Sequence, residues 1–249
     1  MRYYHPRYLF RRYELMRRIE NGAHFLEIGP GELALAQDLL KKFTKGTLID
    51  FNSTNVELTY RKLDESRKER LELIIADFIQ YQFGQQFDCV VACEVLEHIE
   101  DDRVFLRKVN DLLKNRGQLI LSVPARQKYW SKDDEIVGHF RRYEKQELYG
   151  KLIEADFKQI KIIAYGFPFQ NLVRLGRVGL ARLQYDKKVK WDKKKQTQQS
   201  AFMIEKTPWM DLIGIVLNQY TIYPFNVFAS LFNEMDLSEG YVVSATKEM

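Results

Sequence analysis

The sequence predicts an α/β fold built on a doubly wound, mostly parallel sheet of seven strands. Short apolar runs alternate with amphipathic segments along the first 165 residues. The runs are continuous rather than alternating in polarity, which is typical of parallel strands covered by helices on both faces. A chain of 249 residues, of which 45% are hydrophobic, is long enough to bury the core of one such domain.

The elements are expected in this order. The first is an amphipathic helix over 6–20, with Pro6 in its first turn and an apolar stripe of Leu9, Tyr13, Met16 and Ile19. Six strands then follow as apolar runs, at 25–28, 47–49, 71–76, 87–93, 118–123 and 159–164. Helices with apolar residues at helical spacing separate them, at 32–43, from 53 or 54 to 63, at 101–115 with Gly117 closing it, and at 144–155.

The alternation of strands and helices breaks after Tyr165. Residues 166–238 are apolar and aromatic, interrupted by a lysine cluster around Trp191, and a final strand follows at 241–246. We therefore expect a single domain over 1–249 with four parts: an N-terminal helix in 1–20, a core in 22–165, a helical insertion or lid in 166–238 and the last strand in 239–249. The polar stretch 184–200 is expected to be mobile.

Composition excludes several classes of protein. The net charge of +5 is mildly basic and gives no reason to expect a nucleic-acid partner. No apolar run is long enough for a membrane span and no secretory signal is visible. Cys89 and Cys93 are expected to be buried, reduced thiols, so we expect a cytoplasmic protein. No set of cysteines and histidines has metal-ligand spacing, so no metal is expected.

The stretch "FLEIGPGELALAQDLL" contains the clearest ligand-binding signal. Gly29, Pro30 and Gly31 form a turn between a strand and a helix, where missing side chains let a ligand reach the backbone and the helix offers N–H groups. Asp50, about twenty residues on, is placed to accept ribose hydroxyls. The turn alone fits a dinucleotide as well as another adenosine ligand. Glu27 separates the two, because a carboxylate suits an ammonium group and repels a pyrophosphate.

Four segments together resemble the class I S-adenosylmethionine-dependent methyltransferases: "LEIGPGE", "LID", "ADF" and "FDCVVACEVLEHIEDDRVFLRKVNDLLKNRGQLILSVP". The last is similar to the branch that includes ubiquinone-type methyltransferases. Glu32 departs from the pattern, since many members have a third glycine there. The resemblance covers 22–165 and the last strand, and implies a Rossmann-like methyltransferase fold.

The resemblance also implies how S-adenosylmethionine is held. The methionine end would lie on the glycine turn with Glu27, and the ribose on Asp50 with Phe51 beside it. Asp77 and Phe78 would frame the adenine. Glu94 and Val95 would line the floor near the sulfonium. The helix in 1–20 would cap the pocket.

Candidates for the substrate side come from two motifs. His98, in "LEH", is a candidate catalytic residue or a residue that orients its helix. "GHFRRY" (138–143) resembles a loop motif of some bacterial methyltransferases. In it, His139 is a candidate base or hydrogen-bond donor and Tyr143 a candidate hydrogen-bond donor near the transferred methyl.

Four further residues complete the substrate side. Arg141 or Arg142 would bind an anionic substrate group, or else pin the loop to carboxylates. Tyr13 and Trp130 would shape the substrate mouth. The other two histidines, His5 and His24, are expected at the surface.

The predicted function is transfer of a methyl group to a hydroxyl, less favourably an amine, of a small or lipid-like metabolite. Two alternatives stay open: a catalytically silent partner subunit with the same fold, and a dehydrogenase that uses NAD. Residues 166–238 are expected to form a lid, an ordinary core, or a face for peripheral contact with a membrane or partner.

Overall fold

The computed structural model describes residues 5–51, 53–175, 178 and 218–248. The stretch 184–200, which we expected to be mobile, lies outside these residues. The chain forms two compact units. The sheet unit comprises Arg18–Val123, Gln146–Ile162 and Val243–Met249, and the helical unit comprises Met1–Arg17, Pro124–Lys145 and Ile163–Val242.

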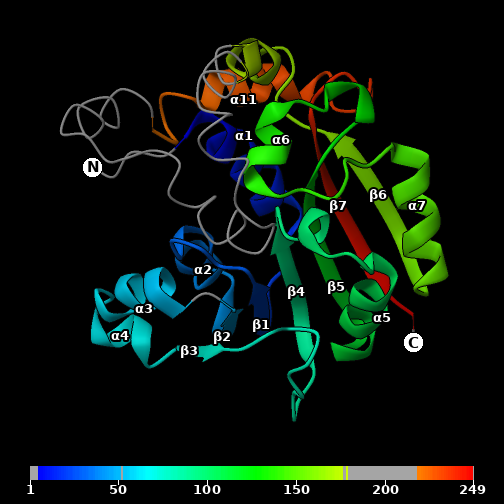
Figure 1. The fold of residues 1–249 in the computed structure, drawn as a ribbon. Coiled ribbons are helices and arrows are strands. Elements are labelled where there is room, and N and C mark those ends of the chain that lie inside the picture. Colours follow the sequence, from blue (N-terminus) through cyan, green and yellow to red (C-terminus); the bar gives the residue numbers. More distant parts are fainter. Residues whose placement is uncertain (1–4, 52, 176–177, 179–217, 249) are drawn as a thin grey trace. The chain divides into compact units, whose positions relative to one another are not determined.

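The predicted doubly wound sheet is confirmed (Figure 1). Its seven strands lie in the order β3-β2-β1-β4-β5-β7-β6. Their bounds are β1 Gly22–Ile28, β2 Phe43–Asp50, β3 Leu71–Ile75, β4 Phe87–Cys93, β5 Leu113–Pro124, β6 Phe157–Ala164 and β7 Gly240–Lys247. The four pairs β1–β2, β1–β4, β2–β3 and β4–β5 are parallel, so these strands end at the same edge.

The helices of the sheet unit are α2 Ala34–Leu39, α3 Ser53–Arg61, α4 Glu65–Lys68, α5 Asp102–Leu112 and α7 Lys145–Glu154, with the 3₁₀ turn η1 Leu96–His98. Two of them, α2 and α5, are shorter than predicted by four residues or more. The helix expected over 32–43 begins only after Leu33, which has a left-handed backbone, and Phe43 already pairs with Gly22 in the sheet.

The helix expected over 101–115 ends at Leu112, because Leu113 pairs with Phe87 as the first residue of β5. Gly117 therefore lies inside a strand and does not close the helix.

The core of the sheet unit is apolar and closely packed around β1 and β4. Phe25 is fully buried and packs edge-on against Phe43, with ring centroids 5.4 Å apart. Gly46 makes room for it, because a Cβ there would overlap the Phe25 ring. Of the two free thiols, Cys89 is buried as expected and Cys93 is only half-buried. Burial raises the pKa of the Cys89 thiol well above its ordinary value.

The helical unit contains α1 Pro6–Arg18, η2 Gln127–Tyr129, α6 Lys132–Val137 and α11 Tyr223–Ser230, together with helical residues 169–175. The first helix exists as predicted, but the face that it buries differs from the predicted apolar stripe. It buries Leu9, Phe10 and Leu15, whereas Tyr13 and Met16 are half-buried. On the buried side of this helix, Asn233 Nδ2 donates to the buried Glu14 Oε1 at 2.9 Å. Among the described residues, none of the helices has the length and apolar character needed to cross a membrane.

Candidate functional site

Four neighbouring strands of the sheet unit bring the predicted cofactor residues to one edge. Ile28 is in register with Ile49 on one side and with Ala92 on the other, and Asp50 is in register with Ile75. The residues that follow Ile28, Ile49, Ile75 and Ala92 therefore meet at the carboxyl ends of β1, β2, β3 and β4. Ligands bind at this edge in open parallel sheets.

The glycine turn has the backbone that its sequence predicts. Gly29 and Gly31 have φ angles of +67° and +52°, in the left-handed region that favours glycine. A Cβ on Gly29 would lie 2.7 Å from Val95 Cγ2, whereas a Cβ on Gly31 would meet nothing within 4 Å. The Gly29 N–H donates to Ile49 O at 2.9 Å. The turn is thus closed against β2 at Gly29 and open at Gly31.

The end of β3 is a second built turn. Ala76 N donates to Asp50 O at 3.0 Å, which brings the ends of β2 and β3 together. The Asp77 carboxylate accepts from Ile79 N at 2.7 Å, and Phe78 is buried against Phe105 with ring centroids 5.0 Å apart. Phe51, by contrast, is exposed.

Lys108, which sequence analysis missed, holds this turn from α5. Its ammonium group donates to Ile79 O at 2.8 Å and to Tyr81 O at 2.6 Å, and lies 5.3 Å from the centre of the Phe78 ring. Lys108 belongs to the site only through these contacts with residues nearly thirty positions earlier in the sequence. No local sequence motif indicates such contacts.

Glu94 directly follows β4 and has a strained conformation, with a φ of +57° that non-glycine residues rarely adopt. Ser122 on β5 supports it twice: Glu94 N donates to Ser122 O at 2.9 Å, and Ser122 Oγ donates to Glu94 Oε1 at 3.0 Å. Ser122 was not predicted either. Such strain, held in place by a neighbouring strand, is typical of binding sites.

The donor set at this edge fits one class of ligand. Glu27 is buried at the end of β1, and Asp50, Asp77 and Glu94 follow at the ends of the next three strands. Four carboxylates suit an ammonium group and hydroxyl or amine donors, as S-adenosylmethionine presents. A pyrophosphate would be repelled. The residues therefore fit the predicted cofactor better than a dinucleotide.

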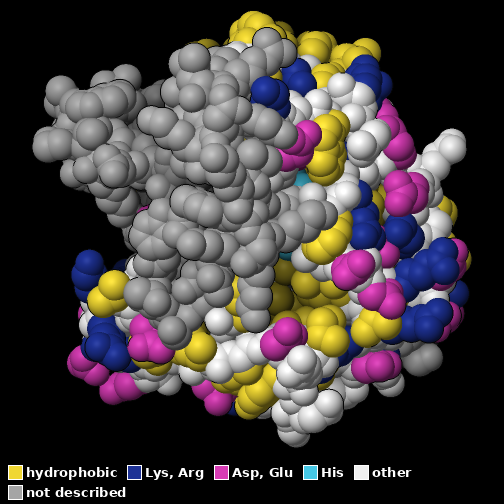
Figure 2. Space-filling view, in the orientation of Figure 1, with side chains coloured by type: hydrophobic (Ala, Val, Ile, Leu, Met, Phe, Trp, Pro, Cys, Tyr) yellow, Lys and Arg dark blue, Asp and Glu magenta, His cyan; other side chains and the backbone are white. Residues whose placement is uncertain are grey.

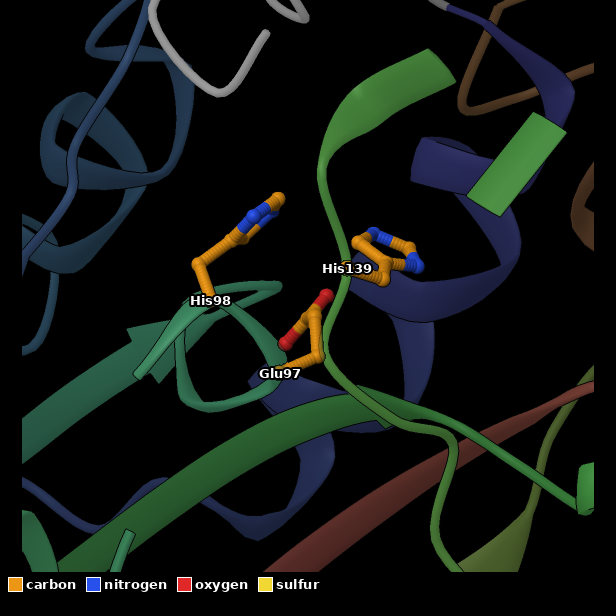
Figure 3. A group of neighbouring side chains, drawn as sticks. All are labelled: Glu97, His98 and His139. Atoms are coloured by element: carbon orange, nitrogen blue, oxygen red, sulfur yellow. The ribbon is translucent and has the colours of Figure 1, made fainter. Parts of the chain in front are cut away.

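The turn η1 after β4 carries Glu97 and His98 as neighbouring side chains (Figure 3). Glu97 is fully buried and His98 is half-buried. His98 belongs to the 3₁₀ turn η1 and not to α5. If His98 orients a helical element, as one of our expectations has it, that element is therefore η1.

In the helical unit, a buried carboxylate organises the "GHFRRY" loop. Asp134 Oδ1 lies 2.8 Å from His139 Nδ1 and 2.8 Å from Arg142 Nε. His139, labelled in Figure 3, follows α6 after the left-handed Gly138. Burial alone would raise the pKa of Asp134, but the hydrogen bond from His139 and the charge of Arg142 outweigh it and hold this pKa well below its usual range.

Arg142 is buried in this network and does not bind an anionic substrate group as one of our two expectations had it. It pairs with Asp134 and also donates to the carbonyls of Ala125 and Glu239 at 3.3 and 3.4 Å. It therefore has the alternative role, that of pinning the loop. Tyr143 is fully buried, and its backbone N–H donates to Pro124 O at 3.0 Å. Arg141 is half-buried and stays the candidate for an anionic group.

Tyr13 and Trp130 lie in different parts of the helical unit. Trp130 Nε1 donates to Glu135 at 3.4 Å, beside α6. Tyr13 lies on α1 and packs edge-on against Tyr223 of α11, with ring centroids 5.9 Å apart. Both tyrosines line an open pocket of about 360 Å³, with Leu9, Arg12, Gln219, Tyr220 and Asn226.

His24 contradicts the expectation of a surface residue. It is buried at the start of the sheet, its Nε2 lies 2.9 Å from Thr47 Oγ1, and its ring packs edge-on against Phe87. Burial, with Lys45 nearby, lowers the pKa of His24 to about 4, so it is neutral at pH 7. His5 is half-buried at the start of α1.

Comparison with known proteins supports the same interpretation. Residues 26–119 match the family model described as a methyltransferase domain. The chain is 32% identical over 108 residues to the mitochondrial ubiquinone biosynthesis O-methyltransferase of Schizosaccharomyces pombe, covering 43% of this chain and 39% of that one. It is 27% identical over 105 residues to (S)-coclaurine N-methyltransferase of Papaver somniferum, covering 41% and 30%.

The chain thus spans well under half the length of these two relatives. Similarity of structure extends further. The solved structure of Haemonchus contortus phosphoethanolamine N-methyltransferase 2 in complex with S-adenosyl-L-methionine has a TM-score of 0.61 and 13% identity, covering 96% of this chain and 52% of that one. At this identity the likeness shows the fold.

Proposed function

We propose that this chain, whose residues 26–119 match a methyltransferase domain, is a class I methyltransferase that transfers a methyl group from S-adenosylmethionine to a hydroxyl group of a small or lipid-like metabolite. The observation that carries the proposal is the set of four strand-end carboxylates beside the Gly29–Gly31 turn. It supports a cationic adenosine ligand and disfavours NAD, the cofactor of the alternative dehydrogenase.

The residues at the carboxyl ends of β1, β2, β3 and β4 each bind one part of the cofactor in this proposal. Glu27 and the turn hold the amino-acid end of the cofactor, Asp50 accepts its ribose hydroxyls with Phe51 beside it, and Asp77 with Phe78 holds the adenine. Glu94 and Val95 line the floor near the sulfonium. The bound cofactor supplies an electrophilic methyl group, and the protein's part is to align the acceptor and exclude water.

His139 is proposed as the base. With Nδ1 bonded to Asp134, the ring carries its proton on Nδ1, so Nε2 is the nitrogen that takes the proton of an acceptor hydroxyl. The carboxylate of Asp134 then stabilises the imidazolium that forms. An amine needs this help less, which is why a hydroxyl acceptor is favoured.

The open pocket on α1 and α11 supports a partly apolar acceptor. Leu9 and three tyrosines, at positions 13, 220 and 223, give it apolar walls, and Arg12 adds a cation. Clefts of this size, apolar with few polar groups, suit organic ligands. We propose that this pocket receives the apolar part of the acceptor.

Turnover of matched acceptors tests the proposal. Purified full-length protein would be given S-adenosylmethionine with 4-alkylphenols and 4-alkylanilines of equal chain length, and release of S-adenosylhomocysteine would be measured. We expect the phenols to be methylated faster. His139→Gln should lower their turnover by about 10²- to 10⁴-fold without changing the affinity for S-adenosylhomocysteine.

Two controls separate the alternatives. His98→Gln reports on the second candidate histidine and should leave turnover higher than His139→Gln does. Equal turnover by the wild type and His139→Gln would reject the base. Binding of S-adenosylhomocysteine with no methylation of any acceptor would favour the silent partner subunit.

A further inference from the structure

The helical unit presents an apolar face. Two of its tyrosines, Tyr220 and Tyr223, also line the proposed acceptor pocket, and its other side chains have no role in the proposed chemistry. Leu172 and Leu175 are 64% and 67% exposed on helical residues 169–175, and Leu231 is 73% exposed just after α11. Tyr220, Tyr223 and Phe228 are also exposed along α11 and the turn before it. These six side chains are called the apolar face below. Figure 2 shows hydrophobic side chains gathered at the upper edge of the view, where Figure 1 places α11.

An aromatic layer fixes the two helices beneath this face. The Phe169 ring packs against Phe225 and Phe228 with centroids 5.2 and 6.0 Å apart, and Phe228 packs against Phe232 at 5.3 Å. On the other side, the Phe10 ring of α1 stacks on Phe169 at 5.8 Å. The exposed leucines therefore lie on a firmly packed support.

Charge is distributed unevenly around this face. Residues 220–233, which include all of α11, contain no charged side chain. The neighbouring helix α1 contains five arginines and one glutamate, and that glutamate, Glu14, is buried. An uncharged apolar surface thus lies beside a helix with a net charge of +4.

The chain that continues from the apolar face is also basic. Residues 174–195 hold nine lysines and arginines and two aspartates, a net charge of +7 against +5 for the whole chain. This segment begins two residues after Leu172 in sequence, so the part of the chain next to the apolar face in sequence is more basic than the chain as a whole.

We propose that the apolar face binds the surface of a lipid bilayer that contains anionic lipids. Leucine, phenylalanine and tyrosine side chains enter the interfacial layer of a membrane, and neighbouring arginines are attracted to anionic headgroups. A second copy of this chain is a poorer occupant, because it would bring two basic helices together. The inference does not depend on the methyl-transfer chemistry.

Vesicle co-sedimentation tests this inference directly. Full-length protein would be mixed with vesicles of phosphatidylcholine alone and with vesicles in which one quarter is phosphatidylglycerol. We expect binding to the anionic vesicles that weakens as salt is raised, and little binding to the neutral ones. Leu172→Asp combined with Leu231→Asp should weaken the binding by about tenfold or more.

The chain offers a matched control pair in the sheet unit. Leu58 and Ile153 are 51% and 45% exposed on α3 and α7, so Leu58→Asp with Ile153→Asp adds the same charge to a comparable surface. This control pair should bind anionic vesicles as the wild type does. The milder pair Leu172→Ala with Leu231→Ala adds no buried or exposed charge and should bind at an intermediate level. It shows whether a loss of binding in the aspartate pair comes from misfolding.

Three results would overturn the inference. One is a wild type that does not sediment with anionic vesicles. Another is an equal loss of binding in the control pair. The third is a wild-type dimer in light scattering that the Leu172→Asp and Leu231→Asp pair converts to monomers. Binding of S-adenosylhomocysteine by both pairs, measured in the same preparations, keeps this test separate from that of the proposed function.

Discussion

The carboxylate of Asp134 accepts a hydrogen bond from His139 Nδ1 at 2.8 Å, and the same oxygen receives Arg142 Nε at 2.8 Å. One buried anion therefore fixes both the orientation of the candidate base and the shape of its loop. Removing it leaves the Arg142 guanidinium buried without its partner charge.

Asp134→Asn should destabilise the protein by about 3–5 kcal/mol, because breaking a buried ion pair from one side strands the other charge. Urea unfolding measures this, and the variant should also lose most of its methyl-transfer rate. Asp133→Asn, at the neighbouring position of α6, is the control and should change stability by less than about 1 kcal/mol. Similar losses in both variants would show that Asp134 does not organise the loop.

Stability should depend on pH through His24. Its pKa of about 4 in the folded protein lies below the ordinary 6.5, so the unfolded chain binds the proton first as pH falls. Through His24, the free energy of unfolding is thus highest above pH 6.5. It decreases as the pH falls from 6.5 to 4, by up to about 3 kcal/mol.

Chemical unfolding of the wild type and of His24→Gln over that pH range isolates the effect of this histidine. The variant should have the smaller decrease, since both proteins share the nearby Lys45, Glu72, Asp88 and Lys114. Identical pH profiles would contradict the buried neutral histidine.

The two turn glycines should respond differently to alanine. At Gly29 the new Cβ would strain the backbone and lie 2.7 Å from Val95, whereas at Gly31 only the backbone cost remains. A left-handed residue costs about 1–2 kcal/mol. Calorimetry with S-adenosylhomocysteine should show the affinity falling by about tenfold for Gly31→Ala and further for Gly29→Ala. A greater loss at Gly31 would place the cofactor contact elsewhere in the turn.

Lys108 should act as a positioning residue for the adenine-side turn. Lys108→Met removes the donor to Ile79 O and Tyr81 O, which should lower stability by about 1–3 kcal/mol and weaken binding of S-adenosylhomocysteine. Lys108→Arg should restore part of both. Arg107→Met, its exposed neighbour on α5, serves as the control. A loss of stability with unchanged affinity would limit Lys108 to a structural role.

Sequence patterns predicted the sheet well because its strands are continuous apolar runs between clear turn signals. The strand expected at 87–93 is β4 as observed, and Glu27, Asp50 and Asp77 were recognisable because each stands at or just beyond a strand end. Helix ends were harder. Leu113 follows a helical pattern, yet pairing with Phe87 places it in β5.

Partners distant in sequence could not be predicted from local patterns. Ser122 and Lys108 become site residues only through contacts with Glu94, Ile79 and Tyr81. Asp134 did leave a local signal, because Ser131 and Asp134 form a capping box at the start of α6. That signal indicates a helix start and not the contact with His139.

The most direct test of the central claim is titration calorimetry of the purified full-length protein with S-adenosylhomocysteine and, separately, with NAD. The arrangement of Glu27, the glycine turn, Asp50 and Asp77 predicts binding of S-adenosylhomocysteine with a Kd on the order of micromolar, no binding of NAD, and weaker binding by Glu27→Gln. Binding of NAD without S-adenosylhomocysteine would contradict the assignment of this edge and with it the proposed methyl transfer.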